Sequence, residues 1–354
     1  MIDIGNFITE MASSELDISD ILIETNAPIM LKTARGWIQA EDVETPTWYD
    51  VDAFLFTIDP SWDAIIRESA LNRPLNLSTR RLRVNAYLAF GGTKIMASIR
   101  LIPNRPLAIG EAGLPAASRL LLENTSGLIL VSGPTGSGKT TSMASMVEAI
   151  NESRNSHIIT IEDPIEFMFE RKCAVFSRRE IGVDCTDFKS GVKDALRQRP
   201  DVVVIGEIRD RETAEQALIA GESGHLVMGT LHAGSALGTI SKLLGYFNSQ
   251  ERDGRLQSLS ENLVGIIHQT LIPKKEGGGY ALAVDFIANH KRQHSKAFFD
   301  MEKLQGSVDR NEDGVSIPLF TSIKKLVNAG VVDKTDAMKA VSGNAFIYDN
   351  LRQL

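Results

Sequence analysis

The sequence has 354 residues, of which 43% are hydrophobic and 23% charged, and its formal net charge is −7. Because single hydrophobic cores stop growing at about 250–300 residues, this length predicts two domains. The acidic balance disfavours a nucleic-acid-binding protein, since such domains are usually basic. No apolar run approaches the roughly 20 residues of a membrane-spanning helix, so no direct membrane insertion is expected. The acidic N-terminus lacks the basic segment of a secretory signal, and we expect a cytosolic protein.

Residues 1–104 predict a small α+β domain. A helix and then an edge strand are expected in "GNFITEMASSELDISDILIE", followed by a hairpin with its turn at Arg35 and Gly36. Helical spacing recurs in "SWDAIIRESALNR", and "RLRVNAYLAFGGTKIMASIRLI" predicts two strands joined at Gly91-Gly92-Thr93. The prolines and glycines that come next predict a linker over residues 105–113.

Residues 114–354 have a different pattern. Short apolar runs alternate with helical stretches, and the runs are "LILVSG", "HIITIED", "DVVVIGE" and "HLVMGT". This alternation predicts an α/β domain whose mainly parallel sheet is covered by helices. After about Gln250 the pattern indicates mostly helix, with a hairpin tip at Lys274–Tyr280.

The segment "GPTGSGKT" directly follows the first of these apolar runs. It matches G-x-x-x-x-G-K-[ST] at every fixed position. Glycines lack a Cβ, so the loop can wrap around a phosphate and point its main-chain N–H groups inward. The following helix adds the positive end of its dipole. The segment and the residue after it, Thr141, therefore predict ATP binding through Gly133, Pro134, Thr135, Gly136, Ser137, Gly138, Lys139, Thr140 and Thr141.

Within this loop, Lys139 is expected to contact the β- and γ-phosphates and Thr140 to ligate Mg²⁺. Glu207, in "DVVVIGEIRD", ends a second buried strand where an acid can orient Mg²⁺ and its water. A strand-end carboxylate that caps the next helix is the structural alternative for Glu207. The general pattern has Asp at this place, so the Glu is a departure.

A third segment, "IITIEDPIEF", carries Glu162, Asp163 and Glu166 at one strand end. Crowded carboxylates repel one another unless a cation lies among them, and the Mg²⁺ of a bound nucleotide would relieve that cost. Glu162 and Asp163 are therefore expected at the nucleotide. A free carboxylate in this cluster can also polarise the attacking water as a general base.

Two histidines, His225 and His232, flank the apolar run in "GESGHLVMGTLHAGSA". No Cys or third His lies near enough to suggest a metal site, so sensing of the γ-phosphate is the favoured interpretation.

By contrast, "DRNEDG" (Asp309–Gly314) matches only the first half of an EF-hand loop, because its twelfth position is Phe320 and not Glu. We expect an exposed acidic loop there.

Together, the glycine loop, "TIEDPIEF", "DVVVIGEIRD" and "AGESGHLVMGTLH" resemble the secretion ATPase superfamily, most closely the PilT-type pilus retraction ATPases. The resemblance is strong over residues 107–273 and faint elsewhere. It implies a RecA-like P-loop ATPase domain, preceded by a PAS-like domain. It also implies that Glu166 is the catalytic base, that Glu207 assists at the metal, and that His232 reaches the γ-phosphate with His225 in support.

The same resemblance implies a homohexamer in which arginines close over the nucleotide between the two domains. Arg83 and Arg100 match these arginines best, since arginine stabilises the charge that develops in phosphoryl transfer. Their alternative role is that of sheet-surface residues. The implied location is the cytoplasmic face of the inner membrane, peripheral to it. An inner-membrane pilus platform protein is the implied partner, and a second retraction ATPase is a further candidate partner.

The leading hypothesis is a hexameric motor that hydrolyses ATP to power type IV pilus retraction. One alternative is the ATPase of a Dot-like type IV or a type II secretion system, and another is a nucleotide-binding accessory ring with little hydrolysis. A DNA-translocating ATPase is disfavoured by the acidic balance. The short N-terminal region and the two cysteines favour retraction or Dot-like secretion over assembly. Residues 283–300 lack the Thr-Pro segment that the family usually has, which leaves the docking to a pilus base open.

Overall fold

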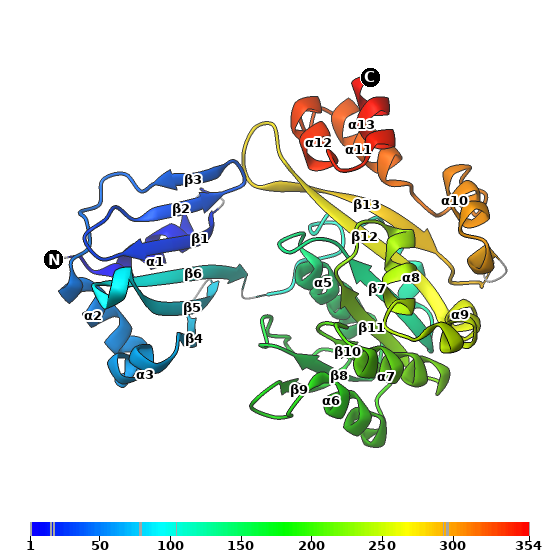
Figure 1. The fold of residues 1–354 in the computed structure, drawn as a ribbon, viewed down its shortest axis with the longest axis horizontal. Coiled ribbons are helices and arrows are strands. Elements are labelled where there is room, and N and C mark those ends of the chain that lie inside the picture. Colours follow the sequence, from blue (N-terminus) through cyan, green and yellow to red (C-terminus); the bar gives the residue numbers. More distant parts are fainter. Residues whose placement is uncertain are drawn as a thin grey trace. The chain divides into compact units, whose positions relative to one another are not determined.

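The computed structural model describes residues 2–14, 16, 18–77, 80–103, 105–292, 294 and 297–353. They form two compact units, one reaching to Arg105 and including Pro273–Tyr280, the other comprising Pro106–Ile272 and Ala281–Leu354. Each unit has its own sheet (Figure 1). Asn104, at the end of the predicted first domain, lies outside the described residues. Within these ranges, no helix has the length and apolar character to cross a membrane.

The first unit is a six-stranded sheet packed against helices. Its strand order is β3-β2-β1-β6-β5-β4, and every neighbouring pair is antiparallel. Ile21, Ile23 and Ile99 share a buried core with Ile4 and Ile8 of the first helix. The elements are α1 (Ile4–Ser13), β1 (Ile18–Glu24), β2 (Met30–Thr33), β3 (Gly36–Gln39), α2 (Trp48–Ile58), α3 (Trp62–Glu68), β4 (Leu71–Asn76), β5 (Arg80–Ala89), η1 (Phe90–Gly92) and β6 (Lys94–Pro103).

Two local expectations for this unit need correction. The strand after α1 is not at an edge, because β1 pairs with β2 on one side and with β6 on the other. The pairing with β6 joins segments far apart in the sequence, which a local pattern does not reveal. The hairpin turn is at Ala34 and Arg35, and Gly36 already opens β3. The two strands joined near Gly91-Gly92-Thr93 are confirmed as β5 and β6.

The second unit contains a seven-stranded sheet in the order β13-β12-β7-β11-β10-β8-β9. All neighbouring pairs from β12 to β9 are parallel. The predicted α/β fold with a mainly parallel sheet is therefore confirmed. Its elements begin with α4 (Ser118–Leu122), β7 (Gly127–Ser132), α5 (Lys139–Ser153), β8 (His157–Glu162), β9 (Val175–Glu180), α6 (Phe188–Ala195), η2 (Leu196–Gln198), β10 (Val202–Ile205), α7 (Arg211–Glu222), β11 (Leu226–Leu231), α8 (Ala236–Leu244) and α9 (Ser249–Asn262).

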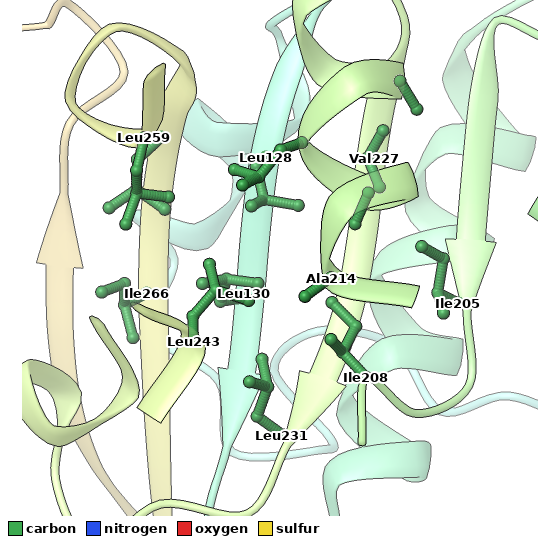
Figure 2. Packing of buried hydrophobic residues seen from close by; sticks show 14 of the residues in the cluster. Leu128, Leu130, Ile205, Ile208, Ala214, Val227, Leu231, Leu243, Leu259 and Ile266 are labelled. Atoms are coloured by element: carbon green, nitrogen blue, oxygen red, sulfur yellow. The ribbon is translucent and has the colours of Figure 1, made fainter. Parts of the chain in front are cut away.

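Helices cover both faces of this sheet, which explains why every residue of the central strands β7, β10 and β11 is buried. Successive residues of a strand point to opposite faces. Leu128 and Leu130 of β7 pack with residues of α7 and α8 (Figure 2). Ile129 and Val131 of the same strand pack with the buried side of α5.

The chain after Gln250 has more helix than strand, as predicted, but two of its segments are not helical. Residues Leu263–Pro273 (β12) and Tyr280–Ala288 (β13) are strands that extend the sheet, not helix. Their apolar runs are buried on both faces, so no alternation marked them as strands. The predicted hairpin tip is confirmed, since the Lys274 N–H donates to the Gly279 carbonyl at 2.9 Å. The remaining elements are η3 (Ala297–Phe299), α10 (Met301–Asp309), α11 (Leu319–Asn328), α12 (Lys334–Ala340) and α13 (Ala345–Arg352).

The predicted acidic loop at Asp309–Gly314 is exposed at every residue except Asp313. The side chain of Asp313 is buried. Its carboxylate lies 2.8 Å from Nε2 of His294 and accepts the main-chain N–H groups of Val315 and Ser316. These contacts account for the acid at this position without a bound cation. Within the divergent segment 283–300, Gln293, Ser295 and Lys296 lie outside the described residues.

Candidate functional site

The glycine loop connects the end of β7 to the start of α5. Gly133, Gly136 and Gly138 have φ angles of 150°, 79° and 83°, a region that side-chain-bearing residues rarely adopt. A Cβ on Gly133 would lie 2.5 Å from Oγ of Ser137 and 2.7 Å from the main-chain oxygen of Gln269. Such contacts are too short for carbon, so only glycine fits at this position.

The loop has the features of an anion site. Gly138 is the N-cap of α5 and provides no side-chain hydrogen bond, so no cap occupies the first-turn N–H groups. Oγ of Ser137 is buried without a hydrogen-bond partner among the described residues. Pro134, Thr135 and Gly136 are exposed on the loop. An orphaned hydroxyl beside an uncapped helix start fits a phosphate group.

The first residues of α5 complete the loop. Thr140 is exposed and Thr141 is half-buried. Lys139 Nζ donates to the carbonyls of Gly133 and Pro134, in both cases at 3.0 Å. Burial lowers the pKa of Lys139, and the negative charge of Glu207 acts against that shift. The ammonium therefore lies over the loop, where a phosphate could replace the carbonyls as its partner.

His232 lies between Lys139 and Glu207. Its Nδ1 is 3.4 Å from Nζ of Lys139, and its Nε2 is 3.3 Å from Oε1 of Glu207. An ammonium can only donate, so Nδ1 accepts and the ring proton is on Nε2, directed at the carboxylate. Three segments that the sequence predicted separately thus meet in one row of contacts.

The strand order explains why these side chains meet. Glu207 lies just after β10. The main chain on each side of it is held by a hydrogen bond of 2.8 Å: the Gly206 N–H donates to the Ile161 carbonyl, and the Ile208 N–H donates to the Thr230 carbonyl. His232 directly follows β11, which lies between β10 and β7. The carboxyl ends of parallel strands meet at one edge of the sheet, the usual ligand edge in such folds.

The acidic segment follows β8, the next strand along that edge. Glu162 accepts from the Thr160 hydroxyl at 2.7 Å and from the main-chain N–H of Glu166 at 3.5 Å. Burial raises the pKa of Glu162, the largest of several influences on it. Asp163 is exposed and Glu166 is half-buried in the turn after the strand. Glu162 therefore stabilises this turn by accepting from the Glu166 N–H, and it ends β8 at the carboxyl edge of the sheet.

Three predicted residues lie elsewhere. His225 precedes β11, and its carbonyl accepts from Gly127 at the start of β7 (3.0 Å). It is thus at the amino end of the strand, about 23 Å from His232 at about 3.3 Å per residue over seven residues, and within one chain it is not brought to the glycine loop. Arg83 and Arg100 lie in the first unit as exposed register partners on β5 and β6. Arg100 pairs with Asp20 at 2.9 Å.

A set of buried polar residues beneath the loop was missed by the sequence analysis. Oγ of Ser132 contacts Oγ1 of Thr239 at 2.6 Å and Nδ1 of His268 at 3.3 Å. Nε2 of Gln269 donates to Oγ of Ser142. The signal available in the sequence was the pair "HQ" inside the otherwise apolar run "LVGIIHQTLI".

Comparison with known proteins identifies the class. Residues 74–299 match the family described as Type II/IV secretion system protein, and the chain belongs to this family. The resemblance to PilT-type members of the secretion ATPase superfamily is thereby confirmed. The type IV pilus retraction ATPase PilT of Pseudomonas aeruginosa is 43% identical over 207 residues, covering 58% of this chain and 59% of that protein.

Two solved structures extend the likeness to nearly the whole chain. The pilus retraction motor PilT with bound ADP superposes with a TM-score of 0.81 and 32% identity, covering 96% of this chain and 97% of that one. The ATPase DotB of Legionella pneumophila gives a TM-score of 0.84 and 25% identity, covering 97% and 96%. These relatives are the pilus retraction ATPase PilT and the ATPase DotB, and the solved PilT structure contains bound ADP.

Proposed function

We propose that this protein is an ATP-hydrolysing motor that powers type IV pilus retraction. The observation that carries the proposal is the row Lys139–His232–Glu207 at the glycine loop, with contacts of 3.4 and 3.3 Å. A charged donor, an imidazole and a carboxylate lie together where the loop would hold the phosphates. The likeness to PilT, a retraction motor with bound ADP, supports both the nucleotide and the direction of the work.

Each residue has a stated task in this proposal. The loop N–H groups and Lys139 bind the phosphates of ATP, and the half-buried Glu166 accepts a proton from the attacking water. His232 turns its Nε2 proton towards Glu207 and so holds that carboxylate in place. Thr140 and Glu207 offer oxygen ligands for Mg²⁺, which when bound would neutralise charge on the phosphates. Asp163 remains a candidate contact of the nucleotide.

Further parts of the proposal rest on the family alone. The second unit is taken as a RecA-like domain and the first as a PAS-like domain, joined by the linker at residues 105–113. Six copies form a ring in the cytoplasm, docked on an inner-membrane platform protein and accompanied by a second retraction ATPase. Arg83 and Arg100 are proposed to close over the nucleotide, and no nucleic acid takes part.

Dot-like secretion is the second candidate, because DotB matches as well in fold as PilT does, with a TM-score of 0.84 against 0.81. In that case the same site would drive export of substrates. The residues at the glycine loop do not distinguish the two, since both functions need ATP hydrolysis.

The test compares cells that lack the gene with cells that carry only the Glu166→Gln form. We expect an excess of surface pili that do not retract in both strains, counted by electron microscopy and followed by live imaging of labelled pili. Cells without pili would indicate an assembly motor. Unchanged pili together with a loss of protein export would replace retraction by secretion.

A further inference from the structure

We propose that the side chains of Ser132, Thr239 and His268 form an ordered chain of hydrogen bonds. This chain positions the segment 232–235, which carries His232, relative to the glycine loop and so affects the rate of ATP hydrolysis. The three side chains come from three separate elements, β7, α8 and β12. All three are buried, with exposed fractions of 0%, 0% and 3%. The proposal rests on the proposed ATP hydrolysis and adds positioning residues to it.

The last hydrogen bond of this series determines which group donates in each of the others. Oγ1 of Thr239 donates to the main-chain carbonyl of Ser235 at 2.9 Å. A hydroxyl has one proton, so the 2.6 Å contact between Thr239 and Ser132 is donated by Ser132. Ser132 then has only lone pairs left for His268, whose Nδ1 must carry the proton across the 3.3 Å contact.

The end of the chain lies next to His232. Ser235 is the N-cap of α8 and follows His232 by three residues. The start of that helix is held a second time, since the Ala236 N–H donates to Oδ2 of Asp285 on β13 at 3.0 Å. Thr239 therefore links Ser132 to Ser235, the last residue of the segment 232–235 that carries His232.

The beginning of the chain lies under the glycine loop. Ser132 is the last residue of β7, and Gly133 follows it directly. Oγ of Ser132 is buried and contacts Thr239 and His268. Loss of these contacts would leave a polar group unpaired away from water, which is costly. Burial and the positive charge of Lys139 lower the pKa of His268 to about 4, so its ring is neutral and carries a single proton.

The neighbouring residue acts on the opposite face of the sheet. Gln269 donates to Ser142 of α5, while His268 contacts Ser132 on the face where α8 packs. Alternation along a strand places successive side chains on opposite faces. β12 therefore contacts both elements that flank the glycine loop, β7 and α5, and only the contact of His268 continues through Ser132 and Thr239 to Ser235.

The matched pair of variants is Thr239→Val, which removes the hydroxyl at nearly constant shape, and Thr239→Ser, which keeps it. The readouts on purified full-length protein are kcat for ATP, the Kd of a fluorescent ADP analogue, and Tm. We expect Thr239→Val to lower kcat by roughly tenfold or more while Kd changes by less than about twofold, because misplacement affects the reacting groups and not binding. Thr239→Ser should restore kcat.

A second measurement tests the proton direction without turnover. Nitrogen-15 NMR of histidine-labelled protein, with His268→Asn to assign the signal, reports which ring nitrogen carries the proton. We expect the Nδ1–H form. The Nε2–H form would overturn the ordered chain, as would wild-type kcat in Thr239→Val. A joint loss of kcat and nucleotide affinity that Thr239→Ser does not restore would also overturn it. If the wild-type protein itself does not hydrolyse ATP, the proposed function fails. The NMR result alone then decides whether the ordered hydrogen bonds of Ser132, Thr239 and His268 exist.

Discussion

Nε2 of His232 lies 3.3 Å from the carboxylate of Glu207, and its other nitrogen lies 3.4 Å from Lys139. This places one imidazole between the two groups that the proposal assigns to the phosphates and to the metal. Since Nδ1 faces a pure donor, the ring is held as the Nε2–H form. The contact gives the histidine segment a physical link to the loop that the sequence could only suggest by resemblance.

Removal of the Glu207 charge is expected to affect hydrolysis more than binding. Glu207→Gln keeps an oxygen for the His232 proton but removes the carboxylate. We expect kcat to fall by roughly a hundredfold, a typical loss for an electrostatic group at a reacting centre. The Kd of ADP should change little. Glu212→Gln, on the exposed first turn of α7, is the control and should behave as wild type.

Lys139→Met is expected to weaken nucleotide binding. The ammonium would make charged hydrogen bonds to the phosphates, each worth ~1.5–3 kcal/mol, which corresponds to roughly a 10- to 100-fold rise in Kd. Fluorescence titration with an ADP analogue measures the change. Lys193→Met removes an exposed lysine of α6 and serves as the matched control. Equal affinities of the two variants would contradict the assignment of Lys139.

Gly133→Ala is expected to disrupt the loop. The new Cβ would meet Oγ of Ser137 at 2.5 Å and the Gln269 carbonyl at 2.7 Å, and the φ of 150° is itself unfavourable. We expect a stability loss of about 1–3 kcal/mol and loss of nucleotide binding. Gly254→Ala on α9 meets no atom within 4 Å and should be neutral or stabilise by up to about 1 kcal/mol. Urea unfolding distinguishes the two.

Asp285 should give the fold a distinct pH dependence. Desolvation raises its pKa from 3.8 to about 6, opposed by the Ala236 N–H. Between these values the unfolded chain has lost the proton that the folded chain still holds, so this group's stabilising contribution falls as pH rises from 4 to 6. The rise corresponds to at most about 3 kcal/mol.

The Asp285→Asn variant measures that contribution. We expect the difference in unfolding free energy, wild type minus variant, to decrease between pH 4 and pH 6 and to stay constant above about pH 7. Urea titrations at four pH values are sufficient. A difference that is constant, or that increases with pH, would show that Asp285 ionises as it does in the unfolded chain.

The fold could be predicted where the local pattern carries the information. Four apolar runs with helices between them indicated the parallel sheet, because buried parallel strands are continuously apolar. The same continuous apolarity concealed β12 and β13. A strand that is buried on both faces shows no alternation of apolar and polar residues, so its pattern alone does not distinguish it from a buried helix. The interior place of β1 depends on its pairing with β6, about 80 residues away, as in Asp20 opposite Arg100.

The candidate site was predictable only in part. The spacing of the glycine loop located Lys139, whereas the chain of Ser132, Thr239 and His268 joins residues 107 and 136 positions apart and has no local signature. His225 and His232 were treated as one motif, although the six residues of β11 hold them at opposite edges of the sheet. The roles of Arg83 and Arg100, the domain limits and the hexamer stay predictions.

The most direct measurement of the central claim is phosphate release from ATP and Mg²⁺ by the purified full-length protein, compared with its Glu166→Gln variant at equal nucleotide occupancy. We expect steady release by the wild-type protein and at least about a hundredfold less by the variant, since a general base contributes a factor on the order of 10²–10⁴ to the rate. Equal rates in the two proteins, or no release by the wild type while it binds ATP, would contradict an ATP-hydrolysing motor and favour a nucleotide-binding accessory ring.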